Sequence, residues 1–127
     1  MSEAASGPEV PASETLSRAV TSPNWWVATE NRVSSAAFAF PVFSVDMASL
    51  ATPDQTLSRF RIGSGLVQFN AGDARHLGFD ARQEIDAQFS ENLAHANVYC
   101  RLPKNERKRR AQQLVWLATI VRAPAFS

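Results

Sequence analysis

The stretch that decides the fold is Asn92-Leu93-Ala94-His95-Ala96-Asn97-Val98-Tyr99-Cys100. Polar and apolar residues alternate along it, and a β-strand points successive side chains to opposite faces of its sheet. The pattern therefore predicts a strand that is buried on one face. The buried face would carry the small apolar side chains of Ala94, Ala96, Val98 and Cys100. The other face, with His95, Asn97 and Tyr99, is our first candidate for one wall of a site.

Two short helices are predicted on either side of a strand. Thr52-Pro53-Asp54-Gln55 is a capping box with proline at the first helical position, so we expect a helix over 53–60 with Leu57 and Phe60 pointing inward. A second helix is expected over 71–78, ended by Gly78. Further strands are expected at 43–46, 65–69 and 79–85. The segment 32–40 fits either a short strand or an extended loop.

A longer helix is predicted over 106–118, where apolar residues recur at helical spacing. The stripe consists of Ala111, Leu114, Val115 and Ala118. The residues after it fit a short strand or a packed tail. Together these elements predict an α+β fold: a small, mostly antiparallel sheet with two or three helices, the C-terminal helix packed on one face.

The domain organisation is predicted from length and composition. The chain has 127 residues, which fits a single domain. Residues 1–22 are rich in Ser, Ala, Glu and Pro and contain no aromatic residue, so we expect a disordered N-terminal tail. The α+β domain would then occupy residues 23–127.

Composition excludes several classes of protein. The single cysteine, Cys100, rules out an internal disulfide and any multi-cysteine metal site, and its place on the apolar face indicates a packed thiol. No apolar run approaches the roughly 20 residues of a membrane-spanning helix. The first residues also lack the basic-then-apolar pattern of a signal peptide. We therefore expect a cytoplasmic location and no membrane partner.

Charge is unevenly distributed along the chain. The net charge is only +1, but residues 101–110 hold six basic residues and one acid, Glu106. They occupy the first turns of the predicted helix, where the helix dipole disfavours positive charge, and this cost suggests a function. We expect a protein partner to dock on the basic turn formed by Lys104, Arg107, Lys108, Arg109 and Arg110. Nucleic acid is the weaker alternative, because no aromatic residues interleave with the basic ones.

Four polar residues are candidates for catalysis if the fold brings them together: Ser34, Ser35, Asp46 and His95. A serine, a histidine and an acid can form a nucleophilic triad, but no nucleophile-elbow motif is present. With Arg32, the same residues can instead form an ion pair and hydroxyl caps that only hold the fold. We expect no metal site and no cofactor, because His76 and His95 are far apart and glycine-rich phosphate loops are absent.

Several motifs follow one another in the middle of the chain. They are Arg32-x-Ser34-Ser35-x-x-Phe38, Phe43-Ser44-Val45-Asp46, Thr52-Pro53, Gly65-Leu66, Ala71-Gly72-x-Ala74-Arg75-x-Leu77-Gly78 and Glu91-Asn92-x-Ala94-His95-Ala96-x-Val98. This series resembles a group of small uncharacterised bacterial proteins over about residues 30–115, although Leu93 stands where that group more usually has proline. The resemblance implies no activity. It implies that Arg32, Ser34, Ser35, Asp46 and His95 belong to one shared framework.

Two functions are compatible with these patterns. The first is a non-enzymatic binding or accessory module that docks a partner through the basic turn. The second is a small enzyme acting on a nucleotide or another phosphate-bearing substrate. In the enzyme, Arg32 would hold the anion, His95 would act as acid or base and Asp46 would orient a partner. Asn97 and Tyr99 would add ligand contacts beside His95.

Overall fold

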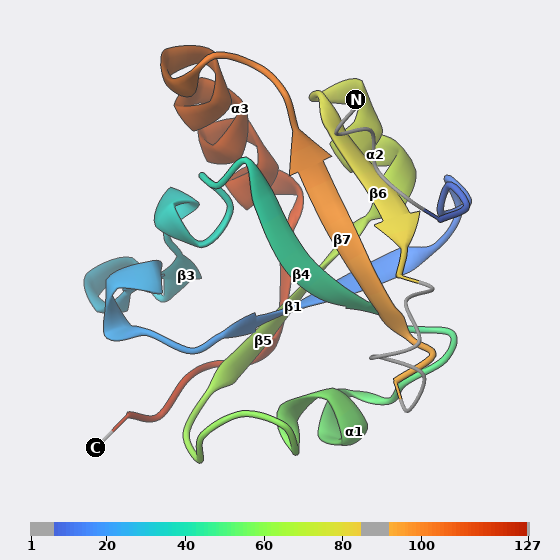
Figure 1. Ribbon diagram of the computed structural model, residues 1–127. Coiled ribbons are helices and arrows are strands. Elements are labelled where there is room, and N and C mark those ends of the chain that lie inside the picture. The colour runs from blue at the N-terminus through green and yellow to red at the C-terminus, as the bar shows by residue number, and fades with distance from the viewer. Residues whose placement is uncertain (1–6, 85–91, 127) are drawn as a thin grey trace.

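A computed structural model of the chain describes residues 7–84 and 92–126. Within them, six strands form one antiparallel sheet in the order β6-β7-β4-β1-β5-β8 (Figure 1). The strands are β1 (Thr15–Val20), β4 (Val42–Met47), β5 (Gly65–Asn70), β6 (Phe79–Gln83), β7 (His95–Cys100) and β8 (Thr119–Arg122). The α-helices are α1 (Pro53–Leu57), α2 (Ala71–His76) and α3 (Lys104–Leu117). The predicted α+β fold is therefore confirmed.

The connection between β1 and β4 is built from short elements. In chain order they are the 3₁₀ helix η1 (Pro23–Trp25), strand β2 (Trp26–Val27), the 3₁₀ helix η2 (Ala28–Glu30), strand β3 (Arg32–Val33) and the 3₁₀ helix η3 (Ser35–Ala37). Strands β2 and β3 pair with each other rather than with the main sheet. The segment 32–40 thus begins as a two-residue strand and continues as a helical turn.

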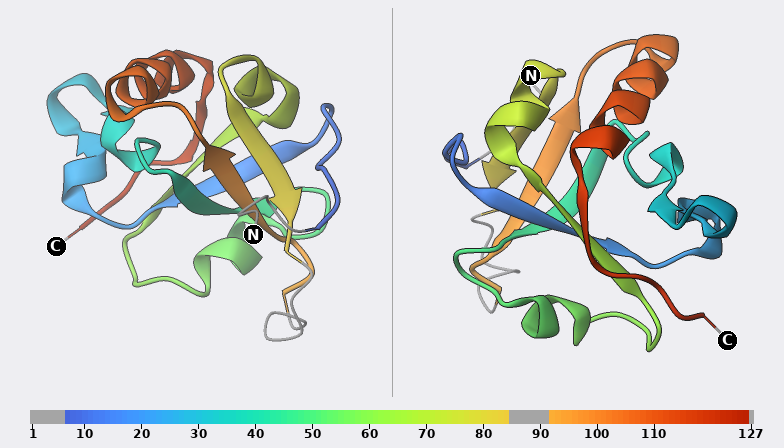
Figure 2. Two further views of the ribbon diagram at one scale, coloured as in Figure 1. Left: turned by 45° about the horizontal axis from the view of Figure 1, so that its top comes forward. Right: turned by 180° about the vertical axis from the view of Figure 1, so that it is seen from behind.

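The hydrophobic core lies on one face of the sheet, under α2, α3 and η3 (Figure 2). Burial alternates along β7 as predicted, with Ala96, Val98 and Cys100 inside. Helix α3 begins two residues earlier than expected and buries Ala111, Leu114 and Val115. The core also contains a cluster of four phenylalanine rings, in which Phe43 contacts the other three: Phe38, Phe69 and Phe79. None of the described helices has the length and apolar character needed to cross a membrane.

The expected N-terminal tail is wrong over residues 15–20, because these residues form the central strand β1. All six pair with β5, from Thr15 opposite Asn70 to Val20 opposite Gly65. Composition does not predict this strand, because Ser17 and Arg18 interrupt its apolar residues. Both polar side chains form hydrogen bonds with residues far along the chain: Ser17 with the side chain of Gln68, and Arg18 with the carbonyl of Ser44. The ordered domain therefore begins before residue 23.

Helix α1 covers the opposite face of the sheet. Its predicted start is confirmed, because Thr52 accepts a hydrogen bond from the amide of Gln55 and the Gln55 side chain accepts one from the amide of Thr52. The expected inward residues are wrong: Thr56 is buried, whereas Leu57 is half-buried and Phe60 is exposed. The reason is that the helix packs over a buried carboxylate rather than over apolar side chains.

Strands β1 and β4 separate soon after they meet. Only Leu16 and Ser17 pair with β4, opposite Met47 and Asp46, while the whole of β1 stays paired with β5. Beyond Ser17 the two central strands diverge, and η1 and η3 lie beside the gap (Figure 1). A cavity lies at this gap, on the face of the sheet that α1 covers.

Candidate functional site

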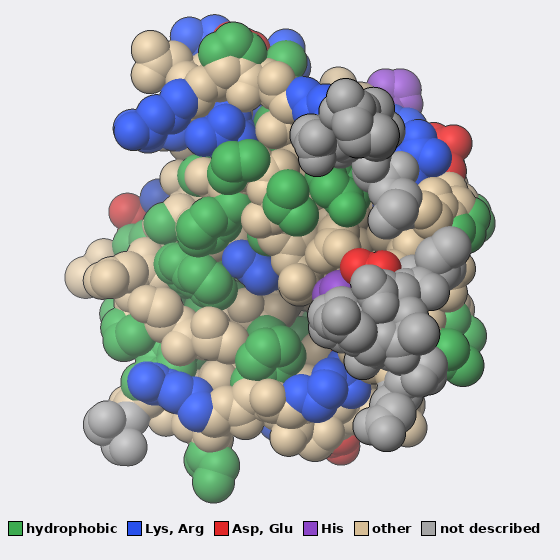
Figure 3. Space-filling model, viewed as in Figure 1, with side chains coloured by type: hydrophobic (Ala, Val, Ile, Leu, Met, Phe, Trp, Pro, Cys, Tyr) green, Lys and Arg blue, Asp and Glu red, His purple; other side chains and the backbone are tan. Residues whose placement is uncertain are grey.

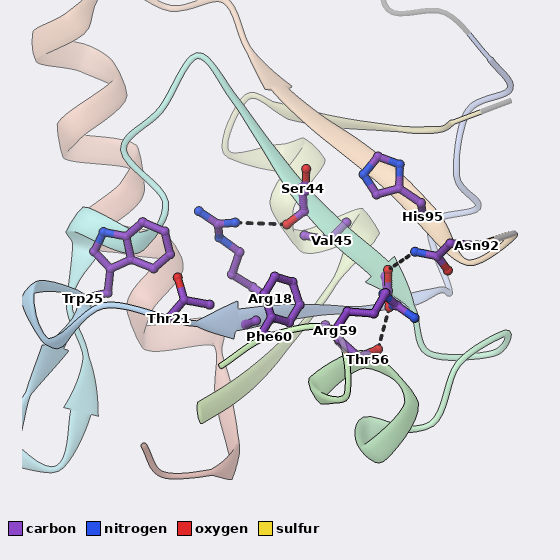
Figure 4. Close-up of a pocket in the computed structure, with 13 residues that line it drawn as sticks. Arg18, Thr21, Trp25, Ser44, Val45, Thr56, Arg59, Phe60, Asn92 and His95 are labelled. Carbon is purple, nitrogen blue, oxygen red and sulfur yellow. Dashed lines mark hydrogen bonds and ion pairs between the residues drawn. The ribbon is translucent and has the colours of Figure 1, made fainter. Parts of the chain in front are cut away.

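A cavity of about 500 Å³ lies where β1 and β4 diverge. Its wall is contributed by β1, β4, α1 with the residues after it, η1, and the start of β7 (Figure 4). In Figure 3, the middle of this face is hollowed between apolar side chains, and basic atoms are visible in the hollow. The lining residues include Arg18, Trp25, Val45, Asp46, Arg59 and His95.

Arg18 occupies the gap between the two strands. Its Nε donates to the carbonyl of Ala37 at 3.0 Å, and its Nη1 donates to the carbonyl of Ser44 at 3.1 Å. The guanidinium carbon lies 4.7 Å from the ring centre of Trp25 and 4.8 Å from that of Phe43. Burial lowers the pKa of Arg18 to about 10, so the group is charged at neutral pH. A cation is thus held in the wall of the cavity by neutral partners.

Asp46 is the centre of a polar cluster at the other end of the cavity. Its carboxylate accepts a hydrogen bond from the hydroxyl of Thr56 at 2.6 Å and one from the amide of Asn92 at 3.3 Å. It also forms an ion pair with Arg59. These partners come from α1, from the residues after it and from the approach to β7, so one buried carboxylate ties together segments that are far apart in sequence.

His95 stands beside this cluster, directly opposite Asp46 in the β4–β7 ladder. The imidazole is half-buried and lines the cavity. Burial lowers the pKa of His95, the nearby Glu84 carboxylate opposes that shift, and the Arg59 guanidinium adds to it. The net effect favours a neutral imidazole at the cavity wall.

This lowered pKa predicts that the protein loses stability in mild acid. As the pH falls through about 6.5, His95 becomes protonated in the unfolded chain, whereas in the folded chain its lowered pKa keeps the imidazole neutral. The free energy of unfolding therefore decreases. At higher pH the imidazole is neutral in both states and contributes no difference. Urea unfolding at about pH 7.5 and about pH 5.5 measures the change. The decrease should be smaller in His95→Gln than in the wild type.

The matched control is His76→Gln, which removes an exposed histidine at the end of α2. Its unfolding should depend on pH as the wild type does. Equal pH dependence in the wild type and His95→Gln would contradict the prediction.

The structure brings together only two of the five residues that the resemblance places in one framework. Asp46 and His95 both line the cavity. Arg32 lies on β3, where it pairs with Glu30 at 2.6 Å and stacks 5.3 Å from the ring centre of Trp116. Ser34 caps η3 by accepting the amide of Ala36 at 3.1 Å, and Ser35 is the first residue of η3. Ser34 therefore acts as a hydroxyl cap, as the structural interpretation predicts. The ion pair expected between Arg32 and Asp46 is not formed, because Asp46 pairs with Arg59 instead.

Asn97 and Tyr99 continue the row that His95 begins, but neither lines the cavity. The amide of Asn97 donates to Glu84 at 3.2 Å. The ring of Tyr99 lies 5.7 Å from the guanidinium of Arg101. Of the three residues predicted to form one wall of a site, His95 alone lines the cavity.

The basic turn is exposed at the start of α3, but part of its charge is neutralised. Glu106 pairs with Arg109 at 2.7 Å and with Arg110 at 3.0 Å. Arg107 donates to the carbonyl of Leu102 at 3.2 Å. Lys104 and Lys108 are exposed. Docking of a partner at this surface stays a prediction.

Sequence reasoning missed most of the cavity wall. Arg18 lies inside the expected tail, and Thr56, Arg59 and Asn92 give no local signal, because each acquires its role only through contact with Asp46. Residues 15–20 gave no strand signal of their own, because apolar and polar side chains do not alternate along them.

Comparisons with known proteins do not assign this chain to a family. A scan against models of protein families, and searches of curated proteins and of solved structures, found no match. The resemblance to small bacterial proteins therefore stays a prediction. Among residues 7–84 and 92–126, no three His, Cys, Asp or Glu side chains are grouped so that they could hold a metal ion.

Proposed function

We propose that this protein is a binding module for a small organic molecule, which it holds in the cavity between β1 and β4. The observation that supports the proposal is the wall of that cavity. Small-molecule sites commonly have volumes of roughly 300–1,000 Å³ and combine an apolar lining with a few convergent polar groups. This cavity, at about 500 Å³, has Trp25 and Val45 in its wall and charged groups at both ends.

The geometry supports binding rather than catalysis. Asp46 already accepts hydrogen bonds from Thr56 and Asn92 and is paired with Arg59, so its carboxylate holds the wall together. Arg32, which the enzyme hypothesis needs to hold a phosphate, does not line the cavity. The enzyme on a phosphate-bearing substrate and the partner docked at the basic turn are both less well supported than a ligand in the cavity.

The test is a screen of small organic fragments by thermal unfolding of the full chain. A ligand that binds only the folded state stabilises it, by about 2.7 kcal/mol at a concentration one hundred times its Kd. We expect a subset of fragments to raise the unfolding temperature of the wild type. Ser44→Phe places a ring in the cavity from an exposed position of β4 and should abolish these shifts.

Val42→Phe is the matched control, since it adds the same ring to the same strand and face but outside the cavity. The shifts should persist in it. If no fragment stabilises the wild type, or if Ser44→Phe responds as the wild type does, the proposed function is wrong.

A further inference from the structure

The structure also indicates which class of molecule the cavity accepts. We propose that the ligand is an organic monoanion, a carboxylate attached to an apolar body, with its charged group bound by Arg18. This inference rests on the proposed function and makes it more specific. It depends on three observations: the charge of Arg18, which has no counter-ion in the described part of the chain, the charge balance of the cavity wall and the aromatic rings around the guanidinium.

The first observation is that Arg18 is a buried cation that has no counter-ion among residues 7–84 and 92–126. Its exposed fraction is 9%, and its two hydrogen-bond acceptors are backbone carbonyls. In the described part of the chain, no carboxylate lies within ion-pair distance of it. A guanidinium carries five N–H donors, and these contacts use two of them. Burying an unpaired charge is costly, and an anion in the cavity would offset that cost with charge-assisted hydrogen bonds.

The second observation is the charge of the cavity wall as a whole. Among the residues that the structure describes, two arginines line it, Arg18 and Arg59, against one acid, Asp46. Arg59 and Asp46 neutralise each other, and His95 favours the neutral form. The described wall therefore has a single excess positive charge, located on Arg18. One negative charge balances it, whereas a phosphate monoester near pH 7 brings between one and two.

The third observation is the apolar and aromatic surroundings of that charge. The rings of Trp25 and Phe43 approach the guanidinium carbon within 4.8 Å, and Phe40 lies 5.9 Å from it (Figure 4 shows Arg18 beside Trp25). The carbonyls of Ala37 and Ser44 use two of the five N–H groups of the guanidinium, so three remain to bind the oxygen atoms of a carboxylate, as in arginine–carboxylate pairs. Between the two polar ends, the cavity is also lined by Ala19, Val45 and Phe60, and Phe60, which is 42% exposed, offers apolar surface for the body of the ligand.

The experiment compares three probes of similar shape by titration calorimetry with the full chain. They are 2-naphthoate, its neutral amide 2-naphthamide, and 2-naphthyl phosphate. We expect naphthoate to bind at least tenfold more tightly than naphthamide, and naphthyl phosphate to bind no more tightly than naphthoate. This comparison uses only the wild-type protein, so it does not depend on how a substitution affects folding.

Two variants then locate the charge. Arg18→Met removes the cation and retains an apolar side chain, so it should bring the affinity of naphthoate down to that of naphthamide. Arg82→Gln is the matched control, because it removes one positive charge from β6, outside the cavity. It should keep the tenfold preference. Circular dichroism shows whether each variant is folded. If Arg18→Met is unfolded, the three titrations of the wild-type protein decide whether the cavity prefers a monoanion.

The outcomes separate this inference from the proposed function. Equal binding of naphthoate and naphthamide overturns the monoanion while leaving a cavity ligand in place. So does tighter binding of naphthyl phosphate, which would indicate a phosphate-bearing ligand. Binding of neither naphthoate nor naphthamide by a protein that other fragments stabilise also overturns the inference. Failure of every fragment to stabilise the wild type overturns the proposed function itself.

Discussion

Replacing Leu16 with alanine is expected to lower the free energy of unfolding by about 2–5 kcal/mol, the range found when a large core side chain is truncated. Leu16 lies in β1, is 0% exposed and pairs with both Met47 and Phe69. The substitution removes apolar contacts and leaves a cavity in the hydrophobic core on the face of β1. Urea unfolding, followed by tryptophan fluorescence, measures the loss.

The matched control is Leu50→Ala, which makes the same chemical change at a residue that is 55% exposed. Its effect should stay within about 0.5 kcal/mol, as is usual for surface substitutions. The pair of variants also tests the position of β1 directly. If residues 15–20 belonged to a disordered tail, Leu16→Ala would be as mild as Leu50→Ala.

Asp46→Asn is expected to lower the free energy of unfolding by about 2–3 kcal/mol. The change keeps the shape of the side chain but removes the charge that pairs with Arg59, and the loss of one partner from a buried ion pair costs several kcal/mol. We place the effect at the lower end because Arg59 is partly exposed and can turn toward water. Thermal or urea unfolding near neutral pH measures it, where the carboxylate is charged.

Asp54→Asn provides the comparison on the neighbouring helix. Asp54 is 84% exposed and pairs with Arg122 at 3.0 Å, so the same substitution should cost less than about 1 kcal/mol. A similar cost for Asp46→Asn would mean that the cluster around Asp46 does not hold α1 against the sheet. The proposed cavity would then lack a fixed wall.

Local patterns predicted the elements whose side chains follow a simple period. The alternation in 92–100, the capping box at Thr52 and the apolar stripe of α3 all depend on neighbours within a few residues, and each of them is confirmed. The left-handed backbone of Gly78, with φ of 97°, ends α2 as expected. Such signals are visible in sequence because the chain itself supplies the partners.

The rest depends on partners that are distant in sequence. Strand β1 contains an arginine and a serine whose hydrogen bonds reach residues 26 and 51 positions away, so hydropathy alone suggests a polar tail. Thr56 points inward, and not Phe60, because α1 covers Asp46. For the candidate site, the sequence singled out Asp46 and His95 but grouped them with Arg32, Asp46 because it is near in sequence and His95 because of the resemblance. Neither ground reports the contacts that the fold makes, in which Asp46 pairs with Arg59.

The position of β1 has a consequence for synthesis of the protein. This strand is translated before the other strands of its sheet, but its full-length partner is β5, and Thr15 lies opposite Asn70. During translation, β1 cannot complete that pairing until residue 70 has emerged from the ribosome. With elongation at about 5–20 residues per second, the wait lasts several seconds. For that interval the nascent chain carries Leu16 and Val20 without their native cover, so β1 exposes apolar side chains of the kind that chaperones bind.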